Sequence, residues 1–390
     1  MASFVAGELL GVLGGVGLPK VTLCDHRKAF SNPDEDDWKH HAFTDLTFFE
    51  GSFYLTFREG FGHCPPPPPS GRIVVLRSAD AISWQKEAVL RVPDVEHSAD
   101  PKFLAVDRRL FVYTPCEVKR STLVTYGFER LAPGRWSDHF ECAPGVFWRP
   151  KRWRGQYLVT AYAVPDKDVG AKPGREAVAG PVVAVVPRSV GEKIYASSDG
   201  RHWQLHSALY AYESHTGETD LWVEGDRLMA FSRHDPPEGN HYTLLSTFIE
   251  QENRWETVST GRIIQAPCVF RAGGRLFVTG RTCAYPDEEF PALTREFSKF
   301  CQQKPDANPT LTEKYHHGLR TGVFVMDGTR ARQVAELLSA GDSSYPGVVQ
   351  YGREYLISDY SMHEYYRPVK SNTSWITPAD IYVWRIRIEQ

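Results

Sequence analysis

The sequence predicts an all-β protein built as a six-bladed β-propeller. Three observations support this: 13% aromatic residues with 31 glycines and 27 prolines, no sustained helical periodicity over a long stretch, and a pair of strands that recurs along the chain. Strands favour aromatic and β-branched residues, and many short strands need many turns. A propeller with five blades is the alternative that the repeat leaves open.

The recurring unit consists of an opening strand, a turn with glycine or charged residues, and a second strand rich in aromatic residues. TDLTFFEGSFYLTFRE, at 44–59, is its clearest copy. The six copies occupy residues 44–59, 99–115, 144–162, 218–233, 266–281 and 344–360. One unit alone cannot bury both faces of its sheet, so we expect the copies to pack radially around a central channel.

A third strand between copies usually ends in a turn that carries tryptophan. The four such turns are SADAISW (78–84), APGRW (132–136), SSDGRHW (197–203) and QENRW (251–255). The two turns with Asp are as far apart in the sequence as the two with Arg-Trp, so the turns repeat together with the strands. This regularity predicts one propeller domain over residues 1–390.

Three further segments have expected places in this domain. The strand KVTLCD, about 20–25, is expected to close the last blade. Segments 166–192 and 285–318 do not fit the repeat and are expected to be insertions on the rim, as is the proline run at 64–70. Within the second insertion, residues 291–303 are the best candidate for a helix.

Composition and charge exclude several classes of protein. A net charge of −3 does not suggest a nucleic-acid or membrane partner. The seven cysteines contain no C-x-x-C pair, and His316 and His317 have no carboxylate or cysteine at metal-ligand spacing, so we expect no metal and no other cofactor. The first 20 residues lack a basic segment before their apolar stretch, which favours a cytoplasmic protein and leaves secretion open.

Candidate site residues lie on the opening strands, because the innermost strand of each blade lines the channel and a ligand pocket usually opens at one end of it. The polar residues at comparable places are Asp45, Asp100, Glu218, Gln265 and Tyr345. Three of the second strands end in an arginine: Arg58, Arg233 and Arg281. Equivalent arginines in three blades indicate a ligand clamp, although structural ion pairs between blades would give the same pattern.

Several motifs together resemble one known family. SSDGRHW fits the Asp box S-x-D-G-x-x-W, and SADAISW fits it with Ala81 in place of glycine. The other motifs are AFTDLTFFEGSFYLTFREGFGH, SADPKF, FWRPKRWRGQY, GETDLWVEGDRLMAFSR and SSYPGVV. With these, the chain from about residue 40 resembles the sialidase superfamily, and most closely the sialidase-like Asp-box propellers of bacteria.

This resemblance implies a role for each matching residue. Arg58, Arg233 and Arg281 match the arginine triad of sialidases, which would bind a sugar carboxylate through charge-assisted hydrogen bonds. Tyr345 matches the nucleophilic tyrosine and Glu218 the glutamate that activates it, since a phenol with a pKa near ~10 is a weak nucleophile without a base. An Asp acid/base is also expected, and Asp100 is the candidate by position.

The chain departs from the sialidase pattern around the first arginine. Glu59 and Gly60 follow Arg58 where sialidases typically have Ile-Pro, and His63 with the proline run replaces the usual loop. Glu59 and His63 are therefore additional candidates for substrate contacts, and Tyr360, in the same copy of the repeat as Tyr345, is a third. These departures argue for an acidic or polar sugar rather than for sialic acid in particular.

Four functions remain open from the sequence, all with a carbohydrate as the partner. The first is a sialidase-like hydrolase that cleaves a terminal, acidic sugar by a retaining mechanism through Tyr345. The second is an inverting glycosidase whose catalytic carboxylates are Asp45, Asp100 and Glu218. The third is a polysaccharide lyase, and the fourth is a sugar-binding propeller without activity.

Overall fold

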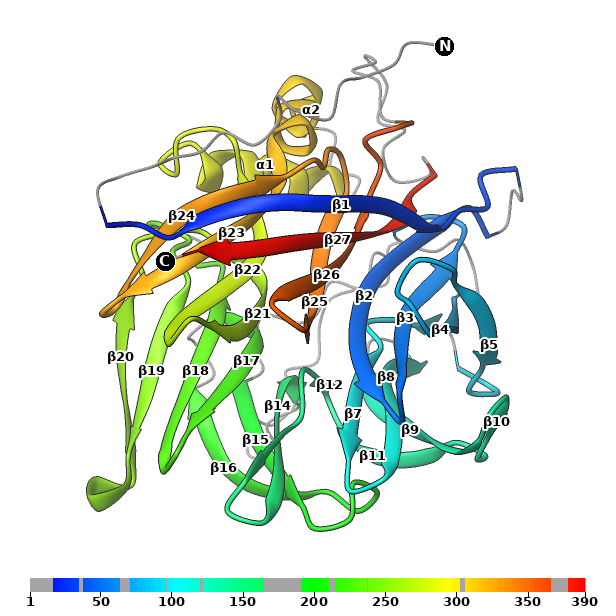
Figure 1. Ribbon diagram of the computed structural model, residues 1–390. Helices are drawn as coiled ribbons and strands as arrows, with labels where there is room; N and C mark the ends of the chain where they lie inside the picture. Colours follow the sequence, from blue (N-terminus) through cyan, green and yellow to red (C-terminus); the bar gives the residue numbers. More distant parts are fainter. Residues whose placement is uncertain are drawn as a thin grey trace.

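Six antiparallel sheets follow one another along the chain in the computed structural model, which confirms the predicted six-bladed β-propeller (Figure 1). The structure describes residues 17–34, 38–63, 71–95, 97–119, 122–164, 191–210, 215–236, 238–301, 306–365 and 378–389. The proline run at 64–70 and all but the last two residues of the predicted insertion 166–192 lie outside these ranges. None of the helices in the described ranges is long and apolar enough to cross a membrane.

The first three blades contain strands β2 to β16. Blade 1 is formed by β2 (His40–Phe49), β3 (Ser52–Gly60), β4 (Arg72–Ser78) and β5 (Gln85–Leu90). Blade 2 is formed by β6 (His97–Ser98), β7 (Lys102–Val106), β8 (Arg109–Lys119), β9 (Thr122–Ala132), β10 (Arg135–Trp136) and β11 (Phe140–Pro144). Blade 3 is formed by β12 (Val146–Phe147), β13 (Lys151–Trp153), β14 (Gln156–Val164), β15 (Gly191–Ser197) and β16 (Gln204–Tyr210).

The other three blades contain β17 to β27 together with β1. Blade 4 is formed by β17 (Thr216–Glu224), β18 (Arg227–His234), β19 (Leu244–Ile249) and β20 (Arg254–Ser259), with a 3₁₀ turn, η1 (Glu250–Glu252), before β20. Blade 5 is formed by β21 (Gln265–Ala272), β22 (Arg275–Cys283), β23 (Leu319–Asp327) and β24 (Arg330–Leu337). Blade 6 is formed by β25 (Ser343–Tyr351), β26 (Glu354–Ser361), β27 (Asp380–Glu389) and β1 (Lys20–Phe30).

The two ends of the chain share blade 6. Strand β1 runs antiparallel to β27, with Lys20 opposite Glu389 and Phe30 opposite Ile381, and the two lie side by side across the molecule in Figure 1. Because the first strand completes the last sheet, the ring of blades is held closed by backbone hydrogen bonds.

The core is divided into layers between neighbouring blades. Blades 3 and 4, for example, pack through a cluster that includes Leu158 and Ile194 on one side and Leu221 and Ala230 on the other. Similar clusters join blades 1 and 2, blades 2 and 3, blades 4 and 5, blades 5 and 6, and blades 6 and 1. This arrangement explains why the strands of the repeat are rich in aromatic and other apolar residues, because both faces of each sheet are covered by a neighbouring blade.

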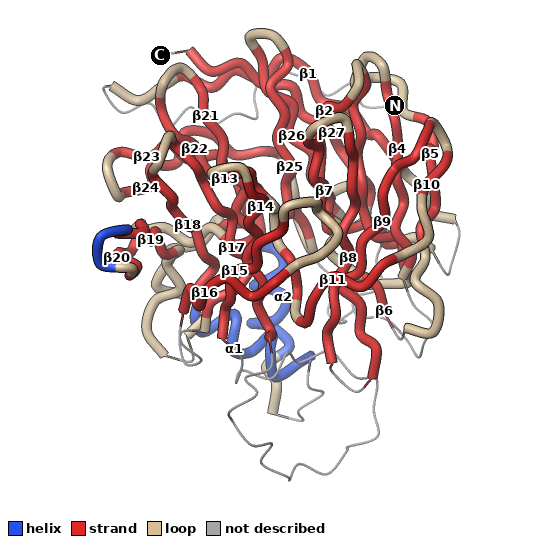
Figure 2. The backbone as a smooth tube through the Cα atoms, turned by 90° about the horizontal axis from the view of Figure 1, so that it is seen from below, coloured by secondary structure: helices blue, strands red, loops and turns tan. Residues whose placement is uncertain are grey.

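Two helices interrupt blade 5 between β22 and β23. They are α1 (Phe290–Cys301), which confirms the helix expected near 291–303, and α2 (Pro309–Gly318), which the sequence pattern did not predict. Asn308 caps α2, because its side chain accepts hydrogen bonds from the N–H groups of Thr310 and Leu311. Figure 2 shows both helices together on one side of the molecule, outside the sheets.

The Asp-box turn is a local structural device. Asp199 Oδ1 accepts hydrogen bonds from the N–H groups of Arg201 at 2.8 Å and His202 at 2.9 Å. Gly200 has a φ of 77° and lies against Phe111, a combination that favours glycine. The turn places Trp203 against Tyr113 of blade 2 and against Phe147 of its own blade.

Replacing Asp199 with alanine is expected to lower the free energy of unfolding by about 1–2 kcal/mol, because backbone N–H groups lose their acceptor. The shift of the urea midpoint measures this loss. Asp226→Ala provides a control, since Asp226 is highly exposed on a hairpin and its nearest cation is 3.6 Å away. Equal midpoints for the two variants would contradict the structural role of the turn.

Candidate functional site

A bulge at the same place in four inner strands prepares the site. Pairing with the second strand shifts register between Ala42 and Asp45, Gly217 and Asp220, Gln265 and Cys268, and Ser344 and Gly347. The residues within these bulges that have positive φ include Phe43 at 62°, Glu218 at 49°, Ala266 at 51° and Tyr345 at 53°. Non-glycine residues seldom adopt such φ values, and bulges redirect side chains, so the repeat positions Glu218 and Tyr345 in equivalent ways.

Glycine at 347 allows the inner strands of blades 6 and 1 to meet closely. A Cβ atom there would collide with the backbone nitrogen of Leu46 on β2. The close approach also lets the Thr44 hydroxyl donate to the carbonyl of Tyr345 at 2.8 Å. Gly347 in SSYPGVV thus serves to fix the strand that carries Tyr345.

The centre of the site is a hydrogen bond between Tyr345 and Glu218. The Tyr345 hydroxyl donates to Glu218 Oε1 at 2.5 Å, and Glu218 Oε2 accepts the N–H of Ala266 at 2.9 Å. Both side chains are buried, with exposed fractions of 5% and 6%. Burial and the charge of Glu218 raise the pKa of Tyr345 well above its usual value, so the phenol is neutral when free of ligand.

Two of the predicted arginines reach this pair. Arg233 Nη1 donates to Glu218 Oε1 at 2.8 Å and lies 3.4 Å from the Tyr345 oxygen, while its Nε donates to Asp235 at 2.5 Å. The guanidinium carbon of Arg281 lies 4.8 Å from the centroid of the Tyr345 ring. Their positive charge opposes the rise in the pKa of Tyr345 and would stabilise negative charge on its oxygen.

Asp342 connects Arg281 to two histidines. Its Oδ1 accepts from Arg281 Nη2 at 3.0 Å and from the Tyr360 hydroxyl at 2.7 Å, and its Oδ2 bonds to His63 Nδ1. His40 Nε2 lies 3.3 Å from the same Oδ2. Burial alone would raise the pKa of Asp342, but His63, His40 and Arg281 together hold it well below its usual range.

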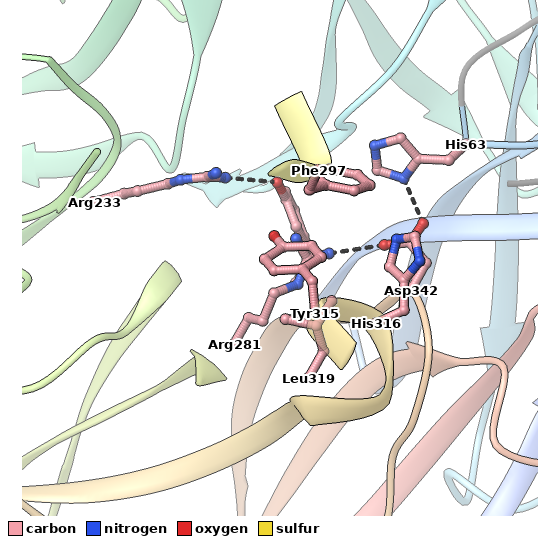
Figure 3. Close-up of a pocket in the computed structure, with 9 residues that line it drawn as sticks. His63, Arg233, Arg281, Phe297, Tyr315, His316, Leu319 and Asp342 are labelled. Carbon is pink, nitrogen blue, oxygen red and sulfur yellow. Dashed lines mark hydrogen bonds and ion pairs between the residues drawn. The ribbon is translucent and has the colours of Figure 1, made fainter. Parts of the chain in front are cut away.

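These groups line a cavity of about 90 Å³. Arg233, Arg281, Asp342, His63 and Tyr345 provide its polar wall, and the helical insertion provides the rest of the wall with Phe297, Tyr315 and His316, followed by Leu319 on β23. Figure 3 shows Arg233 and His63 reaching in from opposite sides, with Tyr315 and His316 in front of the Asp342 network. The insertion therefore belongs to the site and is not merely a decoration of the rim.

The structure places Arg58 outside this cavity, which corrects its expected role as a ligand clamp. Its side chain is fully buried, and its Nη atoms donate to the carbonyl oxygens of Gly62 and of His63, the latter at 3.1 Å. Nη2 also lies 3.1 Å from His40 Nδ1. The loop that follows β3 thus folds back over the guanidinium and satisfies it with backbone oxygens.

Asp45 and Glu59 also lie away from the cavity, contrary to expectation. Asp45 accepts the N–H of Phe103 in blade 2 at 2.8 Å and pairs with the buried Arg149, so it joins blades. Glu59 follows Arg58 on a strand and points to the other face, where it pairs with Arg72 and lies 3.6 Å from His41.

Asp100 is not among the residues that line the cavity, but its carboxyl interacts electrostatically with Glu218 and Tyr345. It has a φ of 40° in the gap between β6 and β7, and its Oδ1 is covered without a hydrogen-bond partner among the described residues. Burial and the charge of Glu218 raise its pKa, against the effect of Lys102. Burial in turn lowers the pKa of Lys102 to about 8, with Arg149 acting in the same direction.

Sequence reasoning missed Asp342, Tyr315 and His316 of the cavity wall, and Asp235, which holds Arg233 from outside the wall. Asp235 follows Arg233 by two positions and Asp342 precedes SSYP directly, so their closeness to predicted residues was a usable signal. Tyr315 and His316 had no such signal, because they belong to the insertion and to no repeat.

Two histidines and one carboxylate near the cavity have the composition of a metal site, but their hydrogen bonds do not suit one. Ligand atoms of His40, His63 and Asp342 lie within 4.8 Å of one another. A guanidinium only donates, so Arg58 requires His40 Nδ1 to accept and leaves the ring proton on Nε2, the atom that faces Asp342. A protonated nitrogen has no lone pair for a metal, and the arrangement instead orients Asp342.

One buried acid near the site makes stability depend on pH. Burial raises the pKa of Glu192 on β15 from 4.5 to about 7, and the charge of Glu218 acts in the same direction. The pKa of Glu192 is higher in the folded state than in the unfolded chain, so the folded state is more stable when this carboxyl is neutral. This contribution is complete below pH 4.5 and is lost as the pH rises to about 7.

Glu192→Gln is therefore expected to raise the free energy of unfolding relative to wild type. The gain at pH 8 should exceed the gain at pH 5 by up to about 3 kcal/mol. Urea midpoints of both proteins at the two pH values measure the difference. Glu224→Gln is the control, since Glu224 is partly exposed and pairs with Arg271 at the surface. The same Glu192→Gln effect at both pH values would contradict a raised pKa.

Comparison with known proteins extends the description of the fold. The sequence matches no protein-family model and no curated protein. Among solved structures, the phage phi92 endosialidase is similar over 94% of this chain and 69% of its own, with a TM-score of 0.59 and 9% identity. A Trypanosoma rangeli sialidase in complex with sialic acid is similar over 93% of this chain and 58% of its own, with a TM-score of 0.59 and 11% identity.

The same trypanosomal sialidase in its covalent intermediate with 2,3-difluorosialic acid gives a TM-score of 0.60 at 10% identity, with 60% of its chain covered. This chain therefore spans about three fifths of the length of those sialidases. At such low identity the likeness concerns the fold, and it confirms a sialidase-like propeller.

Proposed function

We propose that this sialidase-like six-bladed propeller is a glycoside hydrolase that removes a terminal, acidic sugar by a retaining mechanism. The observation that carries the proposal is the 2.5 Å hydrogen bond from Tyr345 to Glu218 at the wall of a cavity that also contains Arg233 and Arg281. A nucleophile next to a base, with cations that favour its ionised form, is the arrangement that covalent catalysis requires.

In the first step, the Tyr345 oxygen attacks the anomeric carbon and its proton passes to Glu218 Oε1. The bond to the leaving oxygen breaks at the same time, and that oxygen takes a proton from Asp100. A neutral phenol approaches an anionic sugar without the repulsion that a carboxylate would meet. Tyrosine nucleophiles of sialidases are the known exception to the use of two carboxylates.

In the second step, water attacks the same carbon and gives its proton to Asp100, while Tyr345 leaves and recovers the proton from Glu218. Asp100 suits this role because burial and Glu218 raise its pKa, which favours the protonated form needed at the start. The anomeric configuration is retained, since two displacements occur.

The names of the similar structures support an acidic substrate, since the trypanosomal enzyme is described with sialic acid bound. Arg233 and Arg281 are the residues of this chain that suit a carboxylate. The inverting alternative loses support, because both Asp45 oxygens are engaged by Arg149 and by a backbone N–H.

A lyase is the second candidate, and one contact favours it. His63 lies at the cavity bonded to Asp342, so a histidine held by a carboxylate faces the same arginines. Such a base could remove a proton next to a sugar carboxylate that the arginines neutralise. The product would be unsaturated, whereas the hydrolase adds water and gives a saturated sugar.

The test is a screen of the wild-type protein against aryl glycosides of nonulosonic acids, uronic acids and neutral sugars, with polyuronides as lyase substrates. Release of the aryl group from an acidic glycoside, with retention shown by NMR of the first product, is the expected result. An unsaturated product from a polyuronide would instead establish the lyase.

A further inference from the structure

Most polar groups at the cavity already have protein partners. Arg233 donates from Nε to Asp235 and from Nη1 to Glu218, and Arg281 donates from Nε to the Ser343 carbonyl and from Nη2 to Asp342 and Tyr360. Within the described residues, no protein acceptor is hydrogen-bonded to Arg233 Nη2 or Arg281 Nη1. One donor nitrogen of each arginine is thus available to a ligand.

A third hydrogen-bond donor without a protein acceptor comes from the helical insertion. Tyr315 on α2 is only 2% exposed and lines the cavity, yet its hydroxyl has no hydrogen-bond partner in the described part of the chain. Its charged surroundings are Arg281, Arg233, Asp235 and Asp342. A buried hydroxyl without a protein partner that borders a cavity points to a ligand.

The ring of Tyr315 is held in a fixed place. It stacks on Phe297 with centroids 4.5 Å apart and planes at 20°, and it packs against Phe290 at 5.7 Å. Burial raises the pKa of Tyr315 to about 12 against the pull of the two arginines, so its hydroxyl keeps its proton and can donate. The site therefore offers two guanidinium donors and one phenol donor to the same space.

We propose that Tyr315 completes a carboxylate clamp with Arg233 and Arg281, in the place that the sequence had assigned to Arg58. This rests on the proposed function and specifies its substrate as a sugar whose carboxylate accepts hydrogen bonds from all three groups. Arg58 cannot take this part, because Gly62 and His63 carbonyls occupy its guanidinium. The insertion, which belongs to no blade, then determines specificity.

The carboxylates that contact the two arginines are engaged by them. Glu218, Asp235 and Asp342 each accept from an arginine of the site, so their charges hold the guanidiniums in place. Arg233 and Arg281 both line the cavity, and each keeps one Nη atom without a protein acceptor among the described residues. A sugar carboxylate has enough lone pairs to accept from three donors.

The test measures binding rather than turnover. N-acetylneuraminic, glucuronic and galacturonic acids, and galactose as the neutral probe, are titrated by calorimetry into wild-type protein and into Tyr315→Phe. We expect saturable binding of at least one acid by wild type and a loss of about tenfold or more in Tyr315→Phe, since a hydrogen bond to a charged group is removed. Any binding of galactose should not change.

Tyr285→Phe is the matched control, because Tyr285 belongs to the same insertion and does not line the cavity. Both variants should keep the wild-type melting temperature, as neither hydroxyl supports the fold. Equal affinity of wild type and Tyr315→Phe for the acid, or no acid bound by wild type, would overturn the inference. Hydrolysis of a neutral glycoside that requires Tyr345 would, in contrast, support the proposed hydrolase and contradict only the carboxylate clamp.

Discussion

Replacing Tyr345 with phenylalanine is expected to lower kcat for the best aryl glycoside by about a thousandfold or more. The variant retains the ring, which packs against Phe43 and Trp148, and removes the oxygen that would form the bond to the sugar. Binding of an acidic sugar should change little, because Arg233 and Arg281 remain. Initial rates and a separate titration of the sugar measure the two quantities.

Tyr355→Phe is the control for loss of a hydroxyl in the same blade. Tyr355 lies on β26 and donates to the carbonyl of Arg271 at 3.0 Å, between blades 5 and 6. Its variant should hydrolyse the glycoside at nearly the wild-type rate. Activity of Tyr345→Phe within a few fold of wild type would contradict the nucleophile and return the chemistry to the carboxylates or to His63.

Replacing Asp45 with alanine is expected to lower the free energy of unfolding by about 3–5 kcal/mol. The change leaves Arg149, which is 5% exposed, without its carboxylate, and the Phe103 N–H without its acceptor. Arg149 also donates to the Pro346 carbonyl, so the damage reaches the strand that carries Tyr345. The urea midpoint measures the loss.

A double variant separates this structural role from catalysis. Asp45→Leu with Arg149→Met removes both charges and should recover part of the lost stability, because the main cost is an unpaired buried cation. The double variant should also regain some activity if Asp45 holds blades together. A stable but inactive double variant would indicate that Asp45 acts in the reaction.

The fold followed from the sequence because the repeat is local. The strand pair recurs six times and the turn with tryptophan four times, so the imperfect copies reinforced one another. The bulge that gives Glu218 and Tyr345 their positive φ also recurs, which is why residues at equivalent places in blades 4 and 6 were predicted together and do meet.

The site predictions that were wrong concern residues whose contacts the repeat does not encode. Arg58 and Arg233 end equivalent strands, yet the residues after Arg58 fold back and bind its guanidinium. Asp45 and Asp220 lie on inner strands, and each accepts a backbone N–H group of the next blade, from Phe103 and Val269 respectively. In the sequence, a carboxylate with this structural role cannot be told apart from a catalytic carboxylate.

The insertion could not be placed from sequence. Residues 291–303 were the best candidate for a helix, but nothing indicated that the following helix would bring Tyr315 to the cavity. Its position depends on packing of Phe290, Leu293 and Leu319 against Tyr315, a cluster separate from the layers between blades. Long-range packing of this kind has no periodic signature.

The most direct test of the account is to trap the intermediate on the enzyme. Wild-type protein is incubated with 2,3-difluorosialic acid, or with the fluorinated analogue of the acid that the screen identifies, then denatured, digested and analysed by mass spectrometry. The account predicts a sugar adduct on the peptide that contains Tyr345, absent from Tyr345→Phe. An adduct on another residue, or hydrolysis of the parent glycoside with inversion and no adduct, would contradict it.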